Sequence, residues 1–368
     1  MATIVLHAGM PKTGSTSIQR WVEREAASLR ARGIDPVVIR PGDRERPRVL
    51  PYRGGPVTSG PIVKRYRELQ RPAPLMLALA TELDRLARGS RSVLVTAEHF
   101  ADLLRKPDPH FAGALERLAG DHEVLVAYYV RPQHSAVEAA WKQYGFRDPD
   151  EQPSSFVRTM SATLRHLRTY RRARRTMPSV TFAMRPFRSD LLFGGDVVTD
   201  FARRFLGIDD MPTGASQWSN PGLPLEAANY IHASYGHAFP HTHEGLARLN
   251  ALKGRLQEAE VPETDAIRRS RMIIQHHCHT EHEADNRTLS RLLRWRARPF
   301  VPPVDWAGQV PGTLDELDAL WHAPAGDAAT AVYDAAIRDV LGTTPGRRRG
   351  RLRARVATVA RRLGAPPA

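Results

Sequence analysis

The sequence predicts an α/β fold, in which helices cover a parallel sheet, followed by a mostly helical C-terminal half. Two observations predict it. Apolar, strand-like runs alternate with helical patterns over the first half of the 368 residues, and the run at 123–130 is apolar enough to be buried on both faces. Beyond about residue 196 the periodicity is helical. Such alternation is typical of parallel sheets that bind ligands at the carboxyl ends of their strands.

The elements of the first half follow from the positions of apolar residues, and a segment rich in Pro and Gly predicts a long loop at 41–74. We expect strands at 3–8, 37–40, 92–97, 123–130 and 179–184, and helices at 15–32, 75–88, 107–119, 134–145 and 154–176. In the second half we expect helices at 196–206, 224–237, 243–258, 264–277, 284–297, 314–322, 327–341 and 350–363.

The composition is that of a basic globular protein. Lys and Arg number 54 against 39 Asp and Glu, which leaves a formal charge of +15 and favours acidic partners. Eight arginines lie within residues 347–362, and without them the charge falls to +7. Charged residues make up 25% and hydrophobic residues 42% of the chain, which excludes disorder throughout.

Cysteine use and hydropathy predict a cytoplasmic protein. Cys278 is the single cysteine, so an internal disulfide framework is excluded. The sequence contains no run of 18 apolar residues, and its N-terminus lacks a basic segment followed by an apolar one. These features favour a reducing compartment.

A loop near the N-terminus has the character of an anion site. Residues 7–19 read His-Ala-Gly-Met-Pro-Lys-Thr-Gly-Ser-Thr-Ser-Ile-Gln, between a predicted strand and a predicted helix. Gly9 and Gly14 let the backbone approach an oxyanion, and the helix dipole favours negative charge there. A nucleoside-triphosphate loop carries its lysine directly after the second glycine, but that position is Ser15 and the lysine is Lys12. A turn that binds no ligand is the alternative.

The segment Pro-Lys-Thr-Gly-Ser-Thr-Ser resembles the phosphosulfate loop of sulfotransferases that use 3′-phosphoadenosine 5′-phosphosulfate (PAPS), above all bacterial members with this loop near the N-terminus. The resemblance implies a P-loop-NTPase-like sheet and PAPS as the donor. It makes Lys12 the catalytic lysine, between the phosphate and the departing sulfuryl group. The residues that it implies for the cradle are Pro11, Lys12, Thr13, Gly14, Ser15, Thr16 and Ser17.

A second segment resembles the part of this family that binds the 3′-phosphate. There an arginine ends a strand and a serine follows eight residues later; here Arg131 matches, but the serine position is Ala139. Arginine offers a planar donor fork suited to phosphate. Ser135 can replace the missing serine if the helix begins late. The alternative is that Ser135 caps this helix together with Glu138.

Two further strand ends carry candidate site residues. Glu98 and His99 directly follow the strand at 92–97, and either can accept the proton of an acceptor hydroxyl. A helix-capping acid beside a surface histidine is the alternative for this pair. Arg185 ends the strand at 179–184 and either contacts the nucleotide or serves as a salt-bridged framework residue.

Two other features are weaker. Five potential metal ligands lie on a predicted helix, where adjacent residues diverge, so we expect no metal site there: His276, His277, Cys278, His279 and His282. The tail carries apolar residues at helical spacing among its arginines. It predicts either contact with an anionic membrane or glycan, or a packed helix with a solvated basic face. We do not expect nucleic acid as a partner, because no aromatic residues interleave with the arginines.

Together these observations predict a sulfotransferase that moves a sulfuryl group from PAPS to an acceptor hydroxyl, on a glycan or a lipid-linked glycan. We divide the chain into an α/β core at 1–210, a helical extension of the same domain on the substrate side at 211–345, and a basic tail at 346–368. The expected location is the cytoplasm, with peripheral contact to the inner membrane face through the tail. The alternatives are a P-loop kinase and an inactive nucleotide- or glycan-binding protein of the same fold.

Overall fold

The computed structural model describes residues 1–10, 12–41, 47–53, 73–89, 92–97, 100–105, 108–148, 150–211, 222–235, 238–240, 242–257, 263–295, 300, 312–321 and 327–342. The chain forms two compact units. The sheet unit comprises Met1–Pro132, Arg165–Ser219 and Ala284–Pro299, and the helical unit comprises Gln133–Leu164, Asn220–Glu283 and Phe300–Ala368. Each unit is thus made of three segments that are distant in the sequence. The tail at 346–368 lies outside the described residues.

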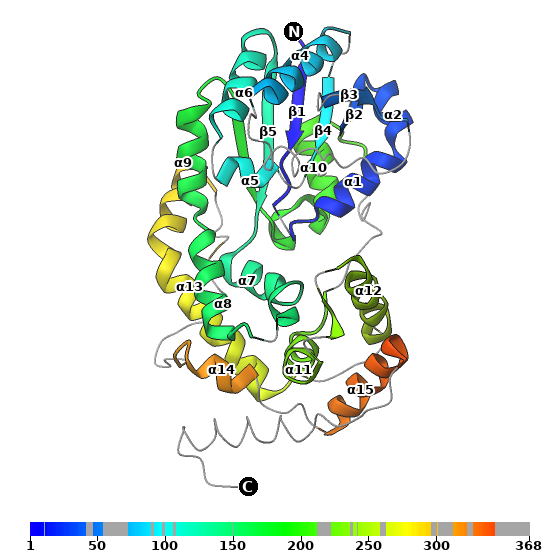
Figure 1. Ribbon diagram of the computed structural model, residues 1–368. Coiled ribbons are helices and arrows are strands. Elements are labelled where there is room, and N and C mark those ends of the chain that lie inside the picture. Colours follow the sequence, from blue (N-terminus) through cyan, green and yellow to red (C-terminus); the bar gives the residue numbers. More distant parts are fainter. Residues whose placement is uncertain are drawn as a thin grey trace. The chain divides into compact units, whose positions relative to one another are not determined.

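The sheet unit is built on one six-stranded sheet with the order β3-β2-β4-β1-β5-β6 (Figure 1). Its neighbouring strands are parallel, apart from β2 and β3, which are antiparallel. This confirms the prediction of an α/β fold with a largely parallel sheet and a helical C-terminal half. The strands are β1 (Thr3–His7), β2 (Ile34–Pro41), β3 (Pro47–Pro51), β4 (Ser92–Thr96), β5 (Glu123–Val130) and β6 (Thr181–Pro186).

Helices cover both faces of the sheet (Figure 1). On one face, α1 (Ser15–Arg24) and α10 (Val197–Leu206) pack against each other and against a buried cluster that includes Val5, Trp21 and Phe201. On the other face, α4 (Ala73–Gly89) packs against α6 (Pro109–Asp121), and α5 (Phe100–Arg105) packs against α9 (His166–Thr176).

The connections that follow β1 and its two neighbours leave the sheet toward opposite faces. The connection that leaves β1 runs through α1 on one face, whereas those that leave its neighbours β4 and β5 lead to α6 and α9 on the other. Where connections leave adjacent parallel strands toward opposite faces, a crevice opens at their carboxyl ends. The loop between β1 and α1 lies at this point.

The helical unit contains the remaining helices and part of α13. A 3₁₀ helix at Gly145–Arg147 follows α7. The α-helices are α7 (Gln133–Trp141), α8 (Pro153–Thr163), α11 (Leu225–Tyr235), α12 (His243–Gln257), α13 (Asp265–Leu292), α14 (Glu316–Trp321) and α15 (Asp327–Leu341).

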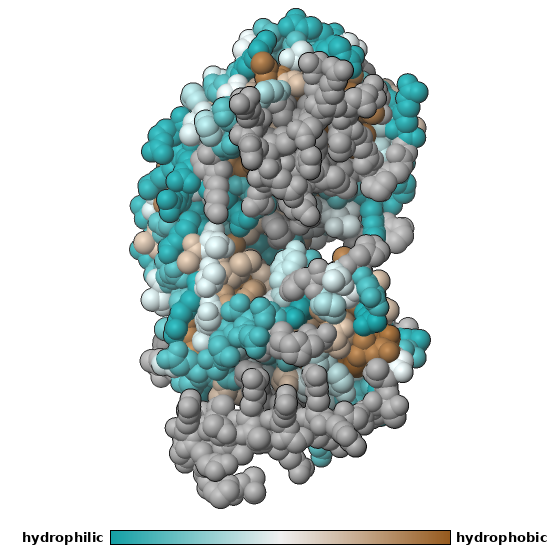
Figure 2. Space-filling model, in the orientation of Figure 1, coloured by the Kyte–Doolittle hydropathy of each residue, from teal (hydrophilic) through white to brown (hydrophobic). Residues whose placement is uncertain are grey.

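The core of the helical unit is aromatic. The ring of Trp141 packs against those of Phe156, His232 and Trp321, with ring centroids 4.5–5.2 Å apart. Its indole N–H donates a hydrogen bond to Asn229 Oδ1 at 2.9 Å, so this fully buried ring leaves no donor unpaired. The described surface is mainly hydrophilic on the face drawn in Figure 2, with an apolar patch over α12 and α15. None of the described helices combines the length and apolar composition needed to cross a bilayer.

Some predicted elements are wrong. The helices expected at 264–277 and 284–297 are one helix, α13, because buried Cys278, His282 and Leu289 continue its inner face through a polar stretch. The helix expected at 15–32 is divided at Glu25 into α1 and α2 (Ala26–Ala31), and the one expected at 154–176 is divided between α8 and α9.

Among the described strands and α-helices, β3 and α5 were not predicted. Strand β3 lies within the predicted loop, and its prolines are tolerated because it is an edge strand. Helix α5 is only six residues long, which is too short for a periodic signal. The helix expected at 350–363 lies outside the described residues.

Candidate functional site

The loop between β1 and α1 is a tight turn closed on one carbonyl group. The backbone N–H and the hydroxyl of Thr13 both donate to the Met10 carbonyl oxygen, at 3.2 and 2.7 Å, and the Ser15 hydroxyl donates to the same oxygen at 3.4 Å. Lys12 and Gly14 have left-handed backbone conformations, with φ of 65° and 77°. For a lysine this conformation costs energy, and such strain is typical of functional loops. Thr13 is fully buried, so its hydroxyl acts within the loop.

Two glycines allow the loop to pack closely. A Cβ atom on Gly9 would overlap the Ser15 side chain, and one on Gly14 would lie 2.7 Å from Val197 Cγ1 on α10. Both positions therefore exclude a larger residue. The conformation of Gly14 also favours glycine by itself.

The N-terminus of α1 follows this loop directly. Gly14 is its N-cap, no described side chain caps the helix, and its first turn contains no acidic residue. The first N–H groups of a helix have no partner within the helix, and the dipole adds positive potential there. Thr16 is exposed and Ser17 is half-buried in this turn. The helix start is therefore suited to an anion.

Arg131 reaches this loop from β5. Its Nη1 donates a hydrogen bond to the Lys12 carbonyl oxygen at 3.1 Å, although the two residues are 119 positions apart. Its guanidinium carbon lies 5.8 Å from the centre of the Phe187 ring, and its own carbonyl oxygen lies 3.0 Å from His166 Nε2 at the start of α9. The structure thus brings the side chain of Arg131 to the backbone of Lys12, two of the three cations that the sequence assigned to the site.

His7 was missed by sequence reasoning. It ends β1, is fully buried, and its Nδ1 lies 2.9 Å from Thr96 Oγ1 at the end of β4. Burial lowers its pKa from 6.5 to about 3, so the imidazole is neutral at physiological pH. Its Nε2 has no hydrogen-bond partner among the described residues. A polar residue that ends an apolar strand was the available signal, but it is also compatible with an ordinary core histidine.

Arg185 has the contacts of a framework residue. Its guanidinium forms an ion pair with Asp200 on α10, with Nη2 2.6 Å from Oδ1, and it also donates to the Leu191 carbonyl oxygen at 3.2 Å. Asp200 is fully buried and accepts a further hydrogen bond from the Tyr129 hydroxyl at 2.7 Å. These contacts match the second of the two interpretations of Arg185, in which it holds the sheet to α10.

Ser135 does not stand at the start of its helix. Helix α7 begins at Gln133, so Ser135 lies inside the first turn, and Glu138 binds Lys142 and Arg271. The helix also does not begin late, which was the condition for a phosphate contact by Ser135. Ser135 and Ala139 belong to the helical unit, whereas Lys12 belongs to the sheet unit.

Three predicted site residues lie outside the described residues: Pro11, Glu98 and His99. The chain that leads to the last two is described. Thr96 and Ala97 are buried, and the Ala97 N–H donates to the His7 carbonyl oxygen at 3.1 Å. The hydrogen bonding between β1 and β4 therefore continues to Ala97, the residue before Glu98. The roles of Glu98 and His99 stay predictions.

The histidine-rich stretch of α13 has local partners. His277 pairs with Glu281 at 3.3 Å, and His282 Nε2 lies 2.9 Å from the Ser161 hydroxyl. Burial raises the pKa of the Cys278 thiol to about 12, which makes it unreactive. Within the ranges described, no three side chains of the metal-ligating kinds converge.

A comparison with protein-family models, curated proteins and solved structures finds no match to this chain. Inferences about its function therefore depend on the residues of the loop, on Arg131, and on the resemblance of the motifs.

Proposed function

We propose that this chain is a PAPS-dependent sulfotransferase with a P-loop-like core. The observation that carries the proposal is the contact between Arg131 and Lys12. By resemblance these residues serve the two ends of one donor, the 3′-phosphate and the phosphosulfate, so they must lie within the span of one nucleotide. The hydrogen bond of 3.1 Å from Arg131 Nη1 to the backbone carbonyl oxygen of Lys12 supports this.

The loop also fits a phosphosulfate group. Gly9 and Gly14 hold the backbone where a Cβ atom would not fit, and the start of α1 has no described side-chain cap and no acidic residue in its first turn. Backbone N–H groups and a positive dipole at a helix N-terminus bind anions of this kind. We assign the binding of the donor to Lys12, Gly14, Ser15, Thr16, Ser17 and Arg131, with Thr13 shaping the turn.

The proposed reaction is an in-line displacement at sulfur. The acceptor oxygen forms a bond to sulfur as the bond from sulfur to the 5′-phosphate oxygen breaks, and the hydroxyl proton passes to Glu98 or His99. Negative charge develops on the phosphate oxygen that leaves. Lys12 and the N-terminus of α1 stabilise this charge, and preorganised groups of this type contribute strongly to catalysis.

The basic composition supports an anionic or glycan-linked acceptor. The formal charge of +15 raises the local concentration of polyanions near the protein. We therefore propose a hydroxyl on a glycan or a lipid-linked glycan as the acceptor, in the cytoplasm. In this proposal the tail at 346–368 contacts the anionic inner face of the membrane.

Nucleotide binding tests the proposal without knowledge of the acceptor. We expect calorimetry to show that 3′-phosphoadenosine 5′-phosphate, the product nucleotide, binds more tightly than ATP. Lys12→Ala should weaken that binding about tenfold or more, because a charged hydrogen bond contributes about 1.5–3 kcal/mol. Arg24→Ala is the matched control, since Arg24 lies on the same helix and its exposed side chain pairs with Glu25. Preference for ATP would favour the kinase alternative.

Transfer of labelled sulfate from PAPS to desulfated heparin or chondroitin tests catalysis. We expect Lys12→Ala to lower the rate by about 10²–10³-fold, the loss typical of removing one group that stabilises transition-state charge. Circular dichroism and Tm should remain those of the wild type. Transfer that survives this substitution would contradict the mechanism, and tight nucleotide binding without transfer would favour the inactive binding protein.

A further inference from the structure

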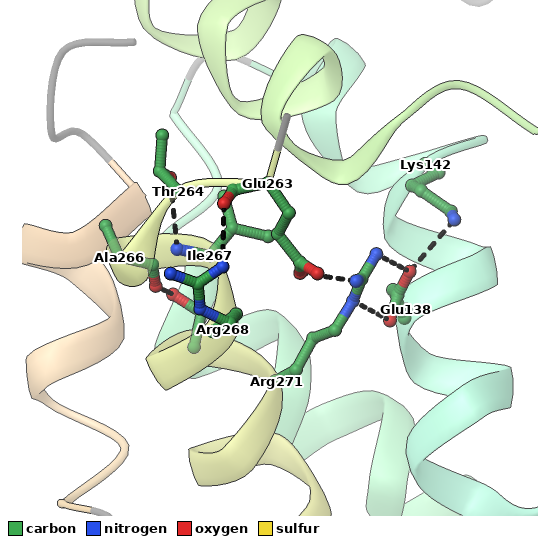
Figure 3. A network of polar contacts seen from close by, with 9 residues as sticks. Glu138, Lys142, Glu263, Thr264, Ala266, Ile267, Arg268 and Arg271 are labelled. Carbon is green, nitrogen blue, oxygen red and sulfur yellow. Dashed lines mark hydrogen bonds and ion pairs between the residues drawn. The ribbon is translucent and has the colours of Figure 1, made fainter. Parts of the chain in front are cut away.

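His7 is a buried side chain that the proposed reaction does not use. It is fully buried, yet its Nε2 has no hydrogen-bond partner among the described residues. The carboxylate of Glu138 shows the more usual arrangement, since both of its oxygens accept from Arg271 and one also accepts from Lys142 (Figure 3). An unpaired polar atom in the interior is costly, and an apolar side chain at this position would avoid that cost.

The other ring nitrogen of His7 joins two strands at their carboxyl ends. Its Nδ1 lies 2.9 Å from Thr96 Oγ1, and both residues are fully buried. The two residues are also the last pair in the register of β1 and β4. The Ala97 N–H extends this pairing by one step, since it donates to the His7 carbonyl oxygen at 3.1 Å. The side-chain bond therefore lies where the two strands end.

The ring of His7 also packs against the loop between β1 and α1. A Cβ atom on Gly9 would lie 3.3 Å from Cε1 of this ring and would overlap the Ser15 hydroxyl. The ring of Phe201 on α10 lies close as well, with its centroid 5.1 Å from that of the imidazole. The loop is therefore in contact with an imidazole that Thr96 and Phe201 hold in place.

The two strand ends that His7 connects lead to the two halves of the proposed reaction. The loop for the donor follows β1, and in the sequence Glu98 and His99 come two and three residues after the end of β4. We propose that His7 is a positioning residue, which holds the end of β4 at a fixed distance from the loop between β1 and α1. This role rests on the proposed sulfotransferase function. It involves no contact with substrate, because the side chain is fully buried.

Turnover with PAPS and desulfated heparin tests this role when nucleotide binding is measured beside it. We expect His7→Leu to lower kcat about tenfold to hundredfold, because small misplacements of reacting groups are this costly. The Kd of 3′-phosphoadenosine 5′-phosphate should change less than about threefold, because leucine still fills the space beside Gly9. His7→Asn keeps an amide that can bond to Thr96, so it should retain most of kcat. A full kcat in His7→Leu would overturn the proposal.

Thr96→Val tests the same bond from its other side. Valine removes the hydroxyl with little change in shape, so this variant also serves where His7→Leu folds poorly. We expect the loss in kcat to match that of His7→Leu. The double variant should lose no more than either single variant, because both remove one shared interaction. Losses that multiply in the double variant would show two independent effects and contradict the proposed role.

His122 provides a matched control at the opposite edge of the sheet. It is 6% exposed, its Nε2 lies 2.8 Å from Asp84 Oδ1, and its Nδ1 has no hydrogen-bond partner among the described residues. It directly precedes β5 and so lies at the amino ends of the parallel strands. His122→Leu should leave kcat unchanged. An equal loss of kcat in this control, or a loss in His7→Leu that only follows a lowered Tm, would identify a structural effect and overturn the proposal.

Hydrogen exchange measures the positioning without turnover. We expect His7→Leu and Thr96→Val to speed exchange in the peptides that contain Thr13 and Ala97, whose N–H groups are bonded at the loop and at the end of β4. His122→Leu should not change these peptides. Unchanged exchange in all variants would overturn the role of His7 even if the wild type transfers sulfate. A wild type that transfers no sulfate contradicts the proposed function, whereas faster exchange in these peptides still supports the link between the strand ends.

Discussion

In the sheet unit several buried polar side chains lie at the carboxyl ends of the strands, whereas in the helical unit several join pairs of helices. His7 meets Thr96 where β1 and β4 end, and Tyr129 and Arg185 meet Asp200 near the ends of β5 and β6. In the helical unit, Glu138 of α7 binds Arg271 of α13, Ser161 of α8 binds Glu281 of α13, and Trp141 of α7 binds Asn229 of α11.

The difference follows from how the backbone N–H and C=O groups of each unit form their hydrogen bonds. A parallel sheet satisfies its backbone groups through the ladder between strands, so polar side chains are needed mainly where the strands end. Those ends are also where a ligand binds. Helices satisfy their own backbone, so specific side-chain pairs between helices fix which helices adjoin. We therefore expect substitutions of buried polar groups to be more costly in the sheet unit.

Asp200→Ala should give the largest effect. This carboxylate is fully buried and accepts from Arg185 and Tyr129, so its removal leaves the partly buried guanidinium of Arg185 without this counter-charge. We expect the free energy of unfolding to fall by about 3–5 kcal/mol, measured by urea denaturation. Asp200→Asn keeps an acceptor for Tyr129 and should lose less. A loss below about 1 kcal/mol for Asp200→Ala would contradict the proposed difference between the units.

His7 should make the sheet unit sensitive to acid. Its pKa is about 3 when folded and 6.5 when unfolded, so the unfolded chain binds the extra proton as pH falls below 6.5. The contribution that the neutral His7 makes to stability is therefore fully present above pH 6.5 and is lost as the pH falls from 6.5 toward 3. Between pH 7 and 5 the loss should be about 2 kcal/mol. His7→Asn should remove this part of the pH dependence; an unchanged slope would show that His7 does not titrate in this way.

Glu138→Gln should give the smallest effect. Lys142 and Arg271 lower the pKa of this carboxyl, but its side chain is 19% exposed and Arg271 keeps Glu263 as a partner. We expect a loss of about 1–2 kcal/mol at pH 7. Because folding lowers the pKa of this carboxyl, its contribution to stability is present above the ordinary pKa of 4.5. The contribution disappears as the pH falls through the lower pKa of the folded state. The gap between variant and wild type should therefore close in acid, and a gap that widened would exclude the ion pair as its cause.

Much of the sheet was predictable, because its strands are continuous apolar runs. The expected strands at 3–8, 92–97 and 123–130 match β1, β4 and β5 to within one residue at each end. The short elements β3 and α5 carry too few residues for a periodic signal, and the polar stretch of α13 hides its continuity. We made these errors because the length of an element and the burial of its residues depend on the elements that pack against it.

The residues of the site also differ in whether local sequence was enough to predict them. The loop at 7–19 was predictable because glycines, a lysine and hydroxyls act locally, between one strand and one helix. The roles of Arg185 and His7 were not, because Asp200 and Thr96 are distant in the sequence.

The alternation of strands and helices and the backbone conformation of the loop at 7–19 can be derived from the sequence, because periodicity and glycine conformation are local properties. The pairing of charges depends on the folded chain. The fold pairs Arg185 with Asp200 and brings Arg131 to the loop. The free energy of a charged group depends on its burial and on the partners that folding brings close to it. Neither can be derived from neighbouring residues in the sequence.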